Sequence, residues 1–133
     1  MSELRVRLAT PADLNFVLAS WFESYWTATA RADGIAFEDY KAGFNKRTAA
    51  LLQRGLVQCA FFEAIPEEVL GYVVREAGVP VAHYAYVKSD FRRQRIAKNL
   101  LRNVEVYTHK TRLGEKLAQS LNLRFDPFRL EFP

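Results

Sequence analysis

Residues 81–97 read VAHYAYVKSDFRRQRIA, and this stretch decides the fold. Val81 to Lys88 are rich in β-branched and aromatic residues, which predicts a strand. A helix is predicted from about Arg92 to Asn103, because apolar residues repeat there at spacings of three and four. A turn from strand to helix exposes backbone N–H groups, and this one carries three arginines, so we expect it to bind an anion such as a pyrophosphate.

The positive charge of the chain is concentrated around the same turn. The whole sequence has a net charge of +4, but residues 88–116 alone hold nine Lys and Arg against three Asp and Glu. Such a surplus attracts a polyanion or a phosphorylated cofactor, and a solvated basic face is the alternative. The turn has neither the Gly-Lys-Ser/Thr of a Walker loop nor the glycines of a dinucleotide-binding fingerprint.

Length and composition favour one domain over residues 1–133. A chain of 133 residues, half of them apolar, can bury a single core without disulfides or a metal. The lone Cys59 fits a reducing compartment and, with two histidines, gives no zinc spacing, so we expect no metal site. The apolar runs are too short to cross a bilayer and the first residues are charged, so we expect a cytoplasmic protein.

The first part of the chain predicts one strand and two helices. Leu4 to Ala9 alternates as a half-buried strand, with Leu4, Val6 and Leu8 facing inward. Thr10-Pro11-Ala12-Asp13 is a helix-start signal, with a hydroxyl at the N-cap, proline at the first helical position and a carboxylate three residues after the cap. A second helix is predicted over Phe37–Gln53.

The later part of the chain predicts mainly strands. Leu56–Ala64 and Leu70–Glu76 are expected to pair as antiparallel strands. After the helix that begins near Arg92, alternation returns at Val104–Thr108, helical spacing at Leu113–Leu121, and an extended stretch closes the chain at Leu123–Phe132. The predicted order is therefore β-α-α-β-β-β-α-β-α-β, an α+β fold.

Val87 to Ala97 resemble the central signature of the GNAT superfamily, the acyl-CoA-dependent N-acyltransferases. In that signature a strand with an apolar last residue precedes Arg/Gln-x-x-Gly-x-Gly/Ala; Val87 resembles the strand end, Arg92 the first position and Ala97 the last. RLATPADLNFVLASWFESY (7–25) and THKTRLGEKLAQSLNLRF (108–125) resemble the beginning and end of the same fold. The resemblance implies a mixed, mostly antiparallel twisted sheet of about six strands flanked by four helices, in a small bacterial or phage-type member.

The resemblance also implies acetyl-CoA as a co-substrate, with its pyrophosphate held by successive backbone amides. The thioester oxygen would accept a hydrogen bond from a backbone N–H at the end of the central strand, near Val87. The residues that the resemblance assigns to the cofactor are Tyr86, Val87, Lys88, Arg92, Arg93, Gln94, Arg95, Ile96 and Ala97.

The sequence departs from the family pattern in three places. Arg95 stands where the family usually has glycine, and its side chain either crowds the phosphates or adds a charge-assisted contact. Ala118 falls where many members have the tyrosine that protonates the leaving thiolate. One closing strand stands in place of the usual hairpin, which favours a homodimer that covers the open edge.

Acyl transfer to an amine requires a group that removes a proton from an ammonium. The candidates near the strand end are His83, Tyr84 and His109, with Tyr86 and Tyr107 as further neighbours. Alternation along the strand predicts that His83 faces away from Tyr84 and Tyr86. A hydrogen-bonded strand histidine without a catalytic role is the alternative for His83.

On the acceptor side, the first two helices contribute aromatic residues. Trp21 and Tyr25 lie on the predicted apolar stripe, so packing in the core is the alternative for both, whereas Trp26 falls off the stripe. Tyr25 and Trp26 are the residues that we assign to the acceptor. Cys59 is expected to be a buried strand residue and not a nucleophile.

Three functions are compatible with these patterns. The leading hypothesis is direct transfer of an acetyl group from acetyl-CoA to a primary amine. The acceptor could be a small amine, a protein amino group, an antibiotic or a nucleobase. The alternatives are a CoA-binding protein without turnover and a basic nucleic-acid-associated module. Aromatic residues do not interleave with the arginines at 92–102, which counts against single-strand stacking there.

Overall fold

The computed structural model describes residues 3–91, 95–108, 119 and 121–126. One sheet runs through it in the strand order β1-β2-β3-β4-β5-β6. The strands are β1 (Leu4–Leu8), β2 (Gly55–Phe62), β3 (Gly71–Glu76), β4 (Val81–Val87), β5 (Val106–Tyr107) and β6 (Arg124–Phe125). The first four strands are antiparallel, and β5 is parallel to both β4 and β6. The predicted α+β class and mixed sheet are confirmed.

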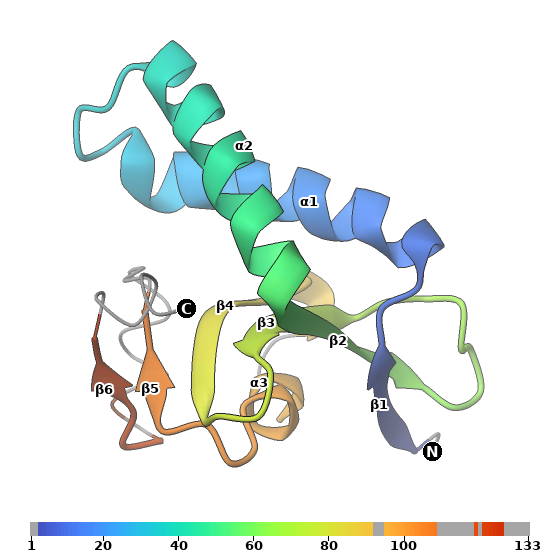
Figure 1. Cartoon of the computed structure of the whole chain (residues 1–133). Coiled ribbons are helices and arrows are strands. Elements are labelled where there is room, and N and C mark those ends of the chain that lie inside the picture. The colour runs from blue at the N-terminus through green and yellow to red at the C-terminus, as the bar shows by residue number, and fades with distance from the viewer. Residues whose placement is uncertain (1–2, 92–94, 109–118, 120, 127–133) are drawn as a thin grey trace.

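The helices cover both faces of this sheet. They are α1 (Pro11–Tyr25), the π-helix η1 (Trp26–Ala30), α2 (Phe37–Arg54), the 3-10 turn η2 (Ser89–Phe91) and α3 (Ile96–Leu100). The α1 and α2 helices lie on one side and α3 lies on the other (Figure 1). The fourth predicted helix falls on residues 113–121, nearly all of which lie outside the described residues. None of the described helices has the length and apolar character needed to cross a membrane.

The start of α1 follows the predicted signal. The backbone N–H of Thr10 donates to Asp13 Oδ2 at 2.7 Å, and the backbone N–H of Asp13 donates to Thr10 Oγ1 at 3.4 Å, so both halves of a capping box are present. The guanidinium of Arg7 also donates to both carboxylate oxygens of Asp13, which ties the end of β1 to the start of α1.

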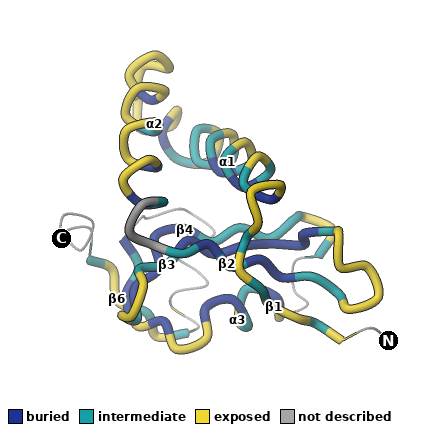
Figure 2. Tube along the Cα trace, turned by 45° about the vertical axis from the view of Figure 1, so that its right-hand side comes forward, coloured by how far each residue is buried: buried dark blue, intermediate teal, exposed yellow. Residues whose placement is uncertain are grey.

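Two apolar clusters fill the space on the two faces of the sheet. We call them the α1-side cluster, centred on Trp21, Cys59 and Tyr72, and the α3-side cluster, centred on Leu70, Ile96 and Leu100. Figure 2 shows the buried residues of the central strands and the exposed outer faces of α1 and α2. Cys59 and Trp21 are buried as predicted, and burial raises the pKa of the Cys59 thiol to about 11.

Two sequence predictions need correction. Leu4 packs against the α3-side cluster, but Val6 and Leu8 are 41% and 60% exposed, because the short α3 does not extend over the far end of β1. The helix predicted from about Arg92 to Asn103 is observed only over Ile96–Leu100, because Arg95 has a left-handed backbone and Leu101, at φ −93° and ψ 14°, leaves the helical conformation.

Candidate active site on strand β4

The centre of β4 contains a β-bulge. Tyr84 pairs with Val74 of β3, but the next residue of β3, Arg75, pairs with Ala82, so His83 is an extra residue in β4. An extra residue bends a strand and resets the alternation of its side chains. Accordingly Ala82 packs in the α3-side cluster, whereas Tyr84, only two residues later, packs in the α1-side cluster.

Before the bulge, β4 pairs with β3 on one edge and with β5 on the other. Val81 pairs with Val106 and Ala82 with Tyr107 of β5, and the N–H of Thr108 donates to the carbonyl of Ala82 at 3.1 Å. Among the described residues, β5 offers no partner to the part of β4 that follows the bulge. The last contact between described residues of these two strands is therefore the hydrogen bond from Thr108 to Ala82, and Figure 1 shows β4 and β5 side by side.

After the bulge, successive residues of β4 turn their N–H and C=O groups alternately toward β3 and away from it. The N–H of Lys88 donates to the carbonyl of Leu70 at 2.9 Å, and Tyr86 pairs with Tyr72 in the same register. Alternation in an antiparallel pair therefore turns the N–H and C=O of Ala85 away from β3, toward the side on which β5 pairs before the bulge. No described residue pairs with Ala85 on that side.

After η2, the chain reaches α3 through a left-handed residue. Arg95 is the N-cap of α3 and has φ 64° and ψ 13°. Glycine adopts this conformation without cost, whereas a side chain strains it. The backbone at this position is therefore the one that glycine would favour, even though arginine occupies it. The predicted cofactor residues Arg92, Arg93 and Gln94 lie outside the described residues.

A basic hollow of about 460 Å³ runs beside α3. Arg95, Lys98 and Arg102 contribute positive charge to its lining, and Leu101, Val104 and Leu121 contribute apolar surface. All three basic residues are exposed. The hollow therefore offers a positively charged surface next to the turn at which we expect phosphate to bind.

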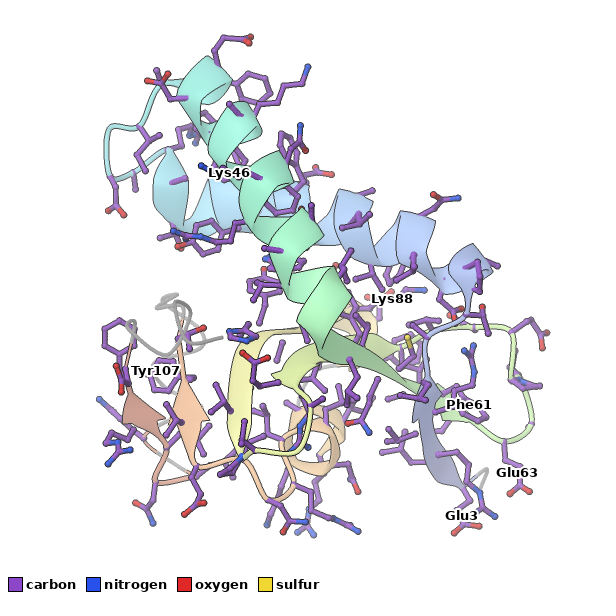
Figure 3. The ribbon with its side chains drawn as sticks, viewed as in Figure 1. Glu3, Lys46, Phe61, Glu63, Lys88 and Tyr107 are labelled. Carbon is purple, nitrogen blue, oxygen red and sulfur yellow. The ribbon has the colours of Figure 1, made fainter. Side chains whose placement is uncertain are left out.

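The side chains of the other predicted cofactor residues point in several directions. Tyr86 stacks on Tyr72 at 5.5 Å between ring centroids on the α1 side, whereas Val87 packs against the α3-side cluster. The ammonium of Lys88 lies 5.0 Å from the ring centroid of Phe16, on the α1 side (Figure 3).

On α3, Ile96 is buried in the α3-side cluster and Ala97 is half-buried. The buried side chain of Ile96 is committed to the core. Ile96 could therefore contribute to cofactor binding through its backbone.

Aromatic residues of α1, η1 and α2 gather above β4. Tyr84 stacks on Trp21 with centroids 5.3 Å apart, and its hydroxyl forms a hydrogen bond with Ser24 Oγ. Of the predicted acceptor residues, Tyr25 contacts the Tyr84 ring edge-on at 6.2 Å, and Trp26 packs against Tyr40 of α2 at 5.2 Å. Tyr25 and Trp26 are half-buried, so both remain partly accessible at the side of β4 that faces α1.

Burial on this side of the sheet raises the pKa values of three phenols. Loss of hydration is the largest cause for Tyr25, Tyr40 and Tyr72. The Tyr72 hydroxyl donates to the carbonyl of Val17 at 3.0 Å and lies 2.8 Å from Ser20 Oγ. These tyrosines therefore stay protonated, and the hydroxyl of Tyr72 ties α1 to the sheet.

The buried side chain of His83 links three strands. Its Nδ1 lies 2.8 Å from Thr108 Oγ1, directly after β5, and its Nε2 lies 3.3 Å from Glu76 Oε1 at the end of β3. Glu76 is two residues beyond Val74, a member of the α1-side cluster, so His83 faces the α1 side like Tyr84. The prediction that His83 faces away from Tyr84 and Tyr86 is wrong, because the bulge resets the alternation.

Two other residues weighed in the sequence analysis, His109 and Ala118, lie outside the described residues. Three groups at the site were not predicted: Glu76, Thr108 and the backbone of Ala85. No local pattern marks them, because register and the bulge bring them to the site. Among residues 3–91, 95–108, 119 and 121–126, no three His, Cys, Asp or Glu side chains are grouped so that they could hold a metal ion.

No protein-family model matches the chain, and no curated protein matches it by sequence. Solved structures do match. A possible acetyltransferase from Clostridium difficile 630 is 16% identical, with a TM-score of 0.56 over 91% of this chain and 90% of that chain. An N-acetyltransferase from Staphylococcus aureus Mu50 is 18% identical, with a TM-score of 0.52 over 91% and 83% of the two chains.

A third similar structure is that of AAC(6')-Iy in complex with the bisubstrate analog CoA-S-monomethyl-acetylneamine. It is 14% identical, with a TM-score of 0.51 over 92% of each chain. At these identities the comparisons show a shared fold, and it extends over nearly the whole of this chain.

Proposed function

We propose that this chain, which has the GNAT fold, transfers an acetyl group from acetyl-CoA directly to a primary amine. The observation that carries the proposal is the edge of β4 after the bulge at His83, where the N–H and C=O of Ala85 turn away from β3 and no described residue pairs with them. Edges of this kind are satisfied by pairing, and a ligand with amide groups can pair with Ala85. The pantetheine arm of CoA has two amides and an extended shape.

The backbone of β4 supplies the groups that the thioester end requires. The N–H of Ala85 turns toward the side on which β5 pairs with the start of β4. An N–H at this place can donate to the thioester oxygen, on which negative charge develops when the amine attacks. Because this donor belongs to a strand held by β3, it needs no rearrangement during the reaction.

The turn from β4 to α3 suits the diphosphate of CoA. The left-handed backbone at Arg95 is the conformation that a glycine-containing phosphate loop would adopt, and the basic hollow begins at the same residue. The predicted contribution of Arg92, Arg93 and Gln94 remains part of this proposal. The acceptor amine would approach from the α1 side, between Tyr25, Trp26 and the ring of Tyr84.

The cofactor part of the proposal is tested by binding. Acetyl-CoA at 100 times its dissociation constant should stabilise the folded protein by about 2.7 kcal/mol, which a thermal-shift assay detects. Arg95→Glu removes a positive charge from the turn and should weaken acetyl-CoA binding about tenfold. Lys46→Glu, on the exposed face of α2 (Figure 3), makes the same change in charge far from the turn and should leave the affinity unchanged.

The transfer part is tested by mass spectrometry of amine panels incubated with acetyl-CoA. Acetylated product supports the proposal. Binding of acetyl-CoA without product from any amine would favour the CoA-binding protein without turnover. Binding of duplex DNA with a steep salt dependence, unaffected by CoA, would favour the nucleic-acid-associated module.

A further inference from the structure

Glu76, His83 and Thr108 form a chain of three hydrogen-bonding side chains across β3, β4 and β5. The His83 side chain has no exposed surface, and Thr108 is 3% exposed. Burial of three polar side chains is costly unless each is hydrogen-bonded, and the contacts of 3.3 Å and 2.8 Å satisfy both ring nitrogens of His83. The chain of contacts is therefore a specific feature of the site and not a chance surface contact.

The chemistry of Glu76, His83 and Thr108 determines which group donates each hydrogen bond between them. A carboxylate can only accept a hydrogen bond, so the contact with Glu76 requires a proton on Nε2 of His83. In a neutral imidazole the other nitrogen, Nδ1, is then an acceptor, and the hydroxyl of Thr108 donates to it. A carboxylate that orients a histidine, which in turn accepts from a hydroxyl, is an arrangement in which the imidazole can take the hydroxyl proton as a general base.

The position of Thr108 connects this chain to the proposed reaction. Thr108 directly follows β5, its N–H donates to the carbonyl of Ala82, and its hydroxyl contacts His83 on the α1 side, where the acceptor would enter. Glu76, at the other end, is 16% exposed, so a proton that reaches it can pass to solvent.

We infer that Thr108, His83 and Glu76 form a proton relay that deprotonates the acceptor amine; this inference rests on the proposed function. The ammonium gives a proton to Thr108 Oγ1 while the hydroxyl proton moves to Nδ1 of His83, and Glu76 stabilises the resulting imidazolium. The neutral amine then forms the C–N bond as the C–S bond of acetyl-CoA breaks, and the second proton that the nitrogen loses passes to the leaving thiolate. Acetyl-CoA and R–NH₃⁺ thus yield the acetylamine, CoA thiol and one proton, which leaves through His83 and Glu76.

The direction of the relay can be tested without turnover. The chain has two histidines, so ¹⁵N–¹H NMR of the full-length protein, with His109→Gln used for assignment, resolves the ring nitrogens of His83. At neutral pH we expect Nε2 protonated and Nδ1 unprotonated, and we expect Thr108→Val to shift the Nδ1 resonance. A proton on Nδ1, whether in the other tautomer or in a doubly protonated ring, would overturn the relay.

Kinetics distinguish a relay from a structural contact. Benzylamine is protonated at neutral pH and aniline is not, so only benzylamine needs the relay. Thr108→Val should lower kcat for benzylamine about 100-fold and leave kcat for aniline within about threefold. Thr108→Ser retains the hydroxyl and should restore the rate with benzylamine. Thr48→Val removes another buried threonine hydroxyl, which donates to the carbonyl of Phe44 in α2, and should change neither rate.

Three other results would overturn the relay. Equal loss with both amines would mean that Thr108 has a structural role. Acetylated Thr108, detected by mass spectrometry after incubation with acetyl-CoA alone, would make the hydroxyl a covalent nucleophile. If the wild-type protein binds acetyl-CoA but acetylates neither amine, the relay has no reaction to serve, while cofactor binding stands. If it does not bind acetyl-CoA at all, the proposed function fails first.

Discussion

The corner between β1 and α1 and the segment from β4 to α3 are built in opposite ways. At the corner, Arg7, Thr10 and Asp13 lie within seven residues of sequence and satisfy one another through the capping box and an ion pair. In the β4–α3 segment, His83 is an extra residue and Arg95 has a left-handed backbone. The corner is specified by local sequence. In the β4–α3 segment the bulge is defined by the pairing of β3 with β4 and not by local sequence, and this segment carries the proposed chemistry.

Gly71→Ala should have the largest effect, because it acts where β3 holds the end of β4. Gly71 pairs with Val87, and a Cβ atom at Gly71 would lie 2.6 Å from the carbonyl oxygen of Tyr86. Backbone cannot move aside as a side chain can, so we expect a loss of about 3 kcal/mol in the free energy of unfolding, measured by urea denaturation. The displaced strand end should also bind acetyl-CoA more weakly.

Gly43→Ala is the matched control for this prediction. Gly43 lies inside α2, and no atom comes within 4 Å of a Cβ placed on it. The same substitution should therefore stabilise the protein by about 1 kcal/mol, through helix propensity. If Gly71→Ala proved as harmless as Gly43→Ala, the end of β4 would not be held as closely as the structure indicates.

The contrast between the two regions explains what could be predicted from sequence. Thr10-Pro11-Ala12-Asp13 predicts the start of α1 because the capping groups are neighbours in the chain. His83 gives no comparable signal. Its contacts with Glu76 and Thr108 span seven and 25 residues, and they depend on a bulge that only the pairing of β3 with β4 defines.

The other features differ in the same way: those set by neighbouring residues could be predicted, and those set by distant contacts could not. The strand from Val81 and the turn after it could be predicted, because composition and period mark them. The exposure of Val6 and Leu8 could not, because it depends on how far α3 reaches across the sheet. The conformation of Arg95 was suggested only by the resemblance to a signature that has glycine there.

Asp13→Asn tests the locally encoded corner and should have an effect of intermediate size. Hydrogen bonding by Arg7 is the largest cause that lowers the pKa of Asp13 from 3.8 to about 2. A carboxyl whose pKa is lower in the folded state stabilises the protein above the unfolded pKa and loses that contribution as the pH falls through the folded pKa. The wild-type advantage should therefore be about 2 kcal/mol at neutral pH and should disappear between about pH 4 and pH 2.

Urea denaturation of both proteins at neutral pH and at low pH measures this difference. Asp39→Asn, in the exposed first turn of α2, is the control and should change stability by less than about 1 kcal/mol. A difference between Asp13→Asn and wild type that stays constant with pH would mean that the corner depends on side-chain shape and not on the charge of Asp13.

Arg95→Gly should have the smallest effect on the free energy of unfolding, and it should stabilise the protein, whereas Gly71→Ala and Asp13→Asn destabilise it. Glycine relieves the strain of φ 64° but gains freedom in the unfolded chain, so we expect a net stabilisation of about 1 kcal/mol by urea denaturation. Asn103→Gly, at a φ of 65°, should gain less, because asparagine tolerates this conformation better than arginine. Loss of the Arg95 charge should at the same time weaken acetyl-CoA binding. Tighter binding would mean that the arginine obstructs the diphosphate. Glycine at this position of the β4–α3 segment would then favour both stability and cofactor binding.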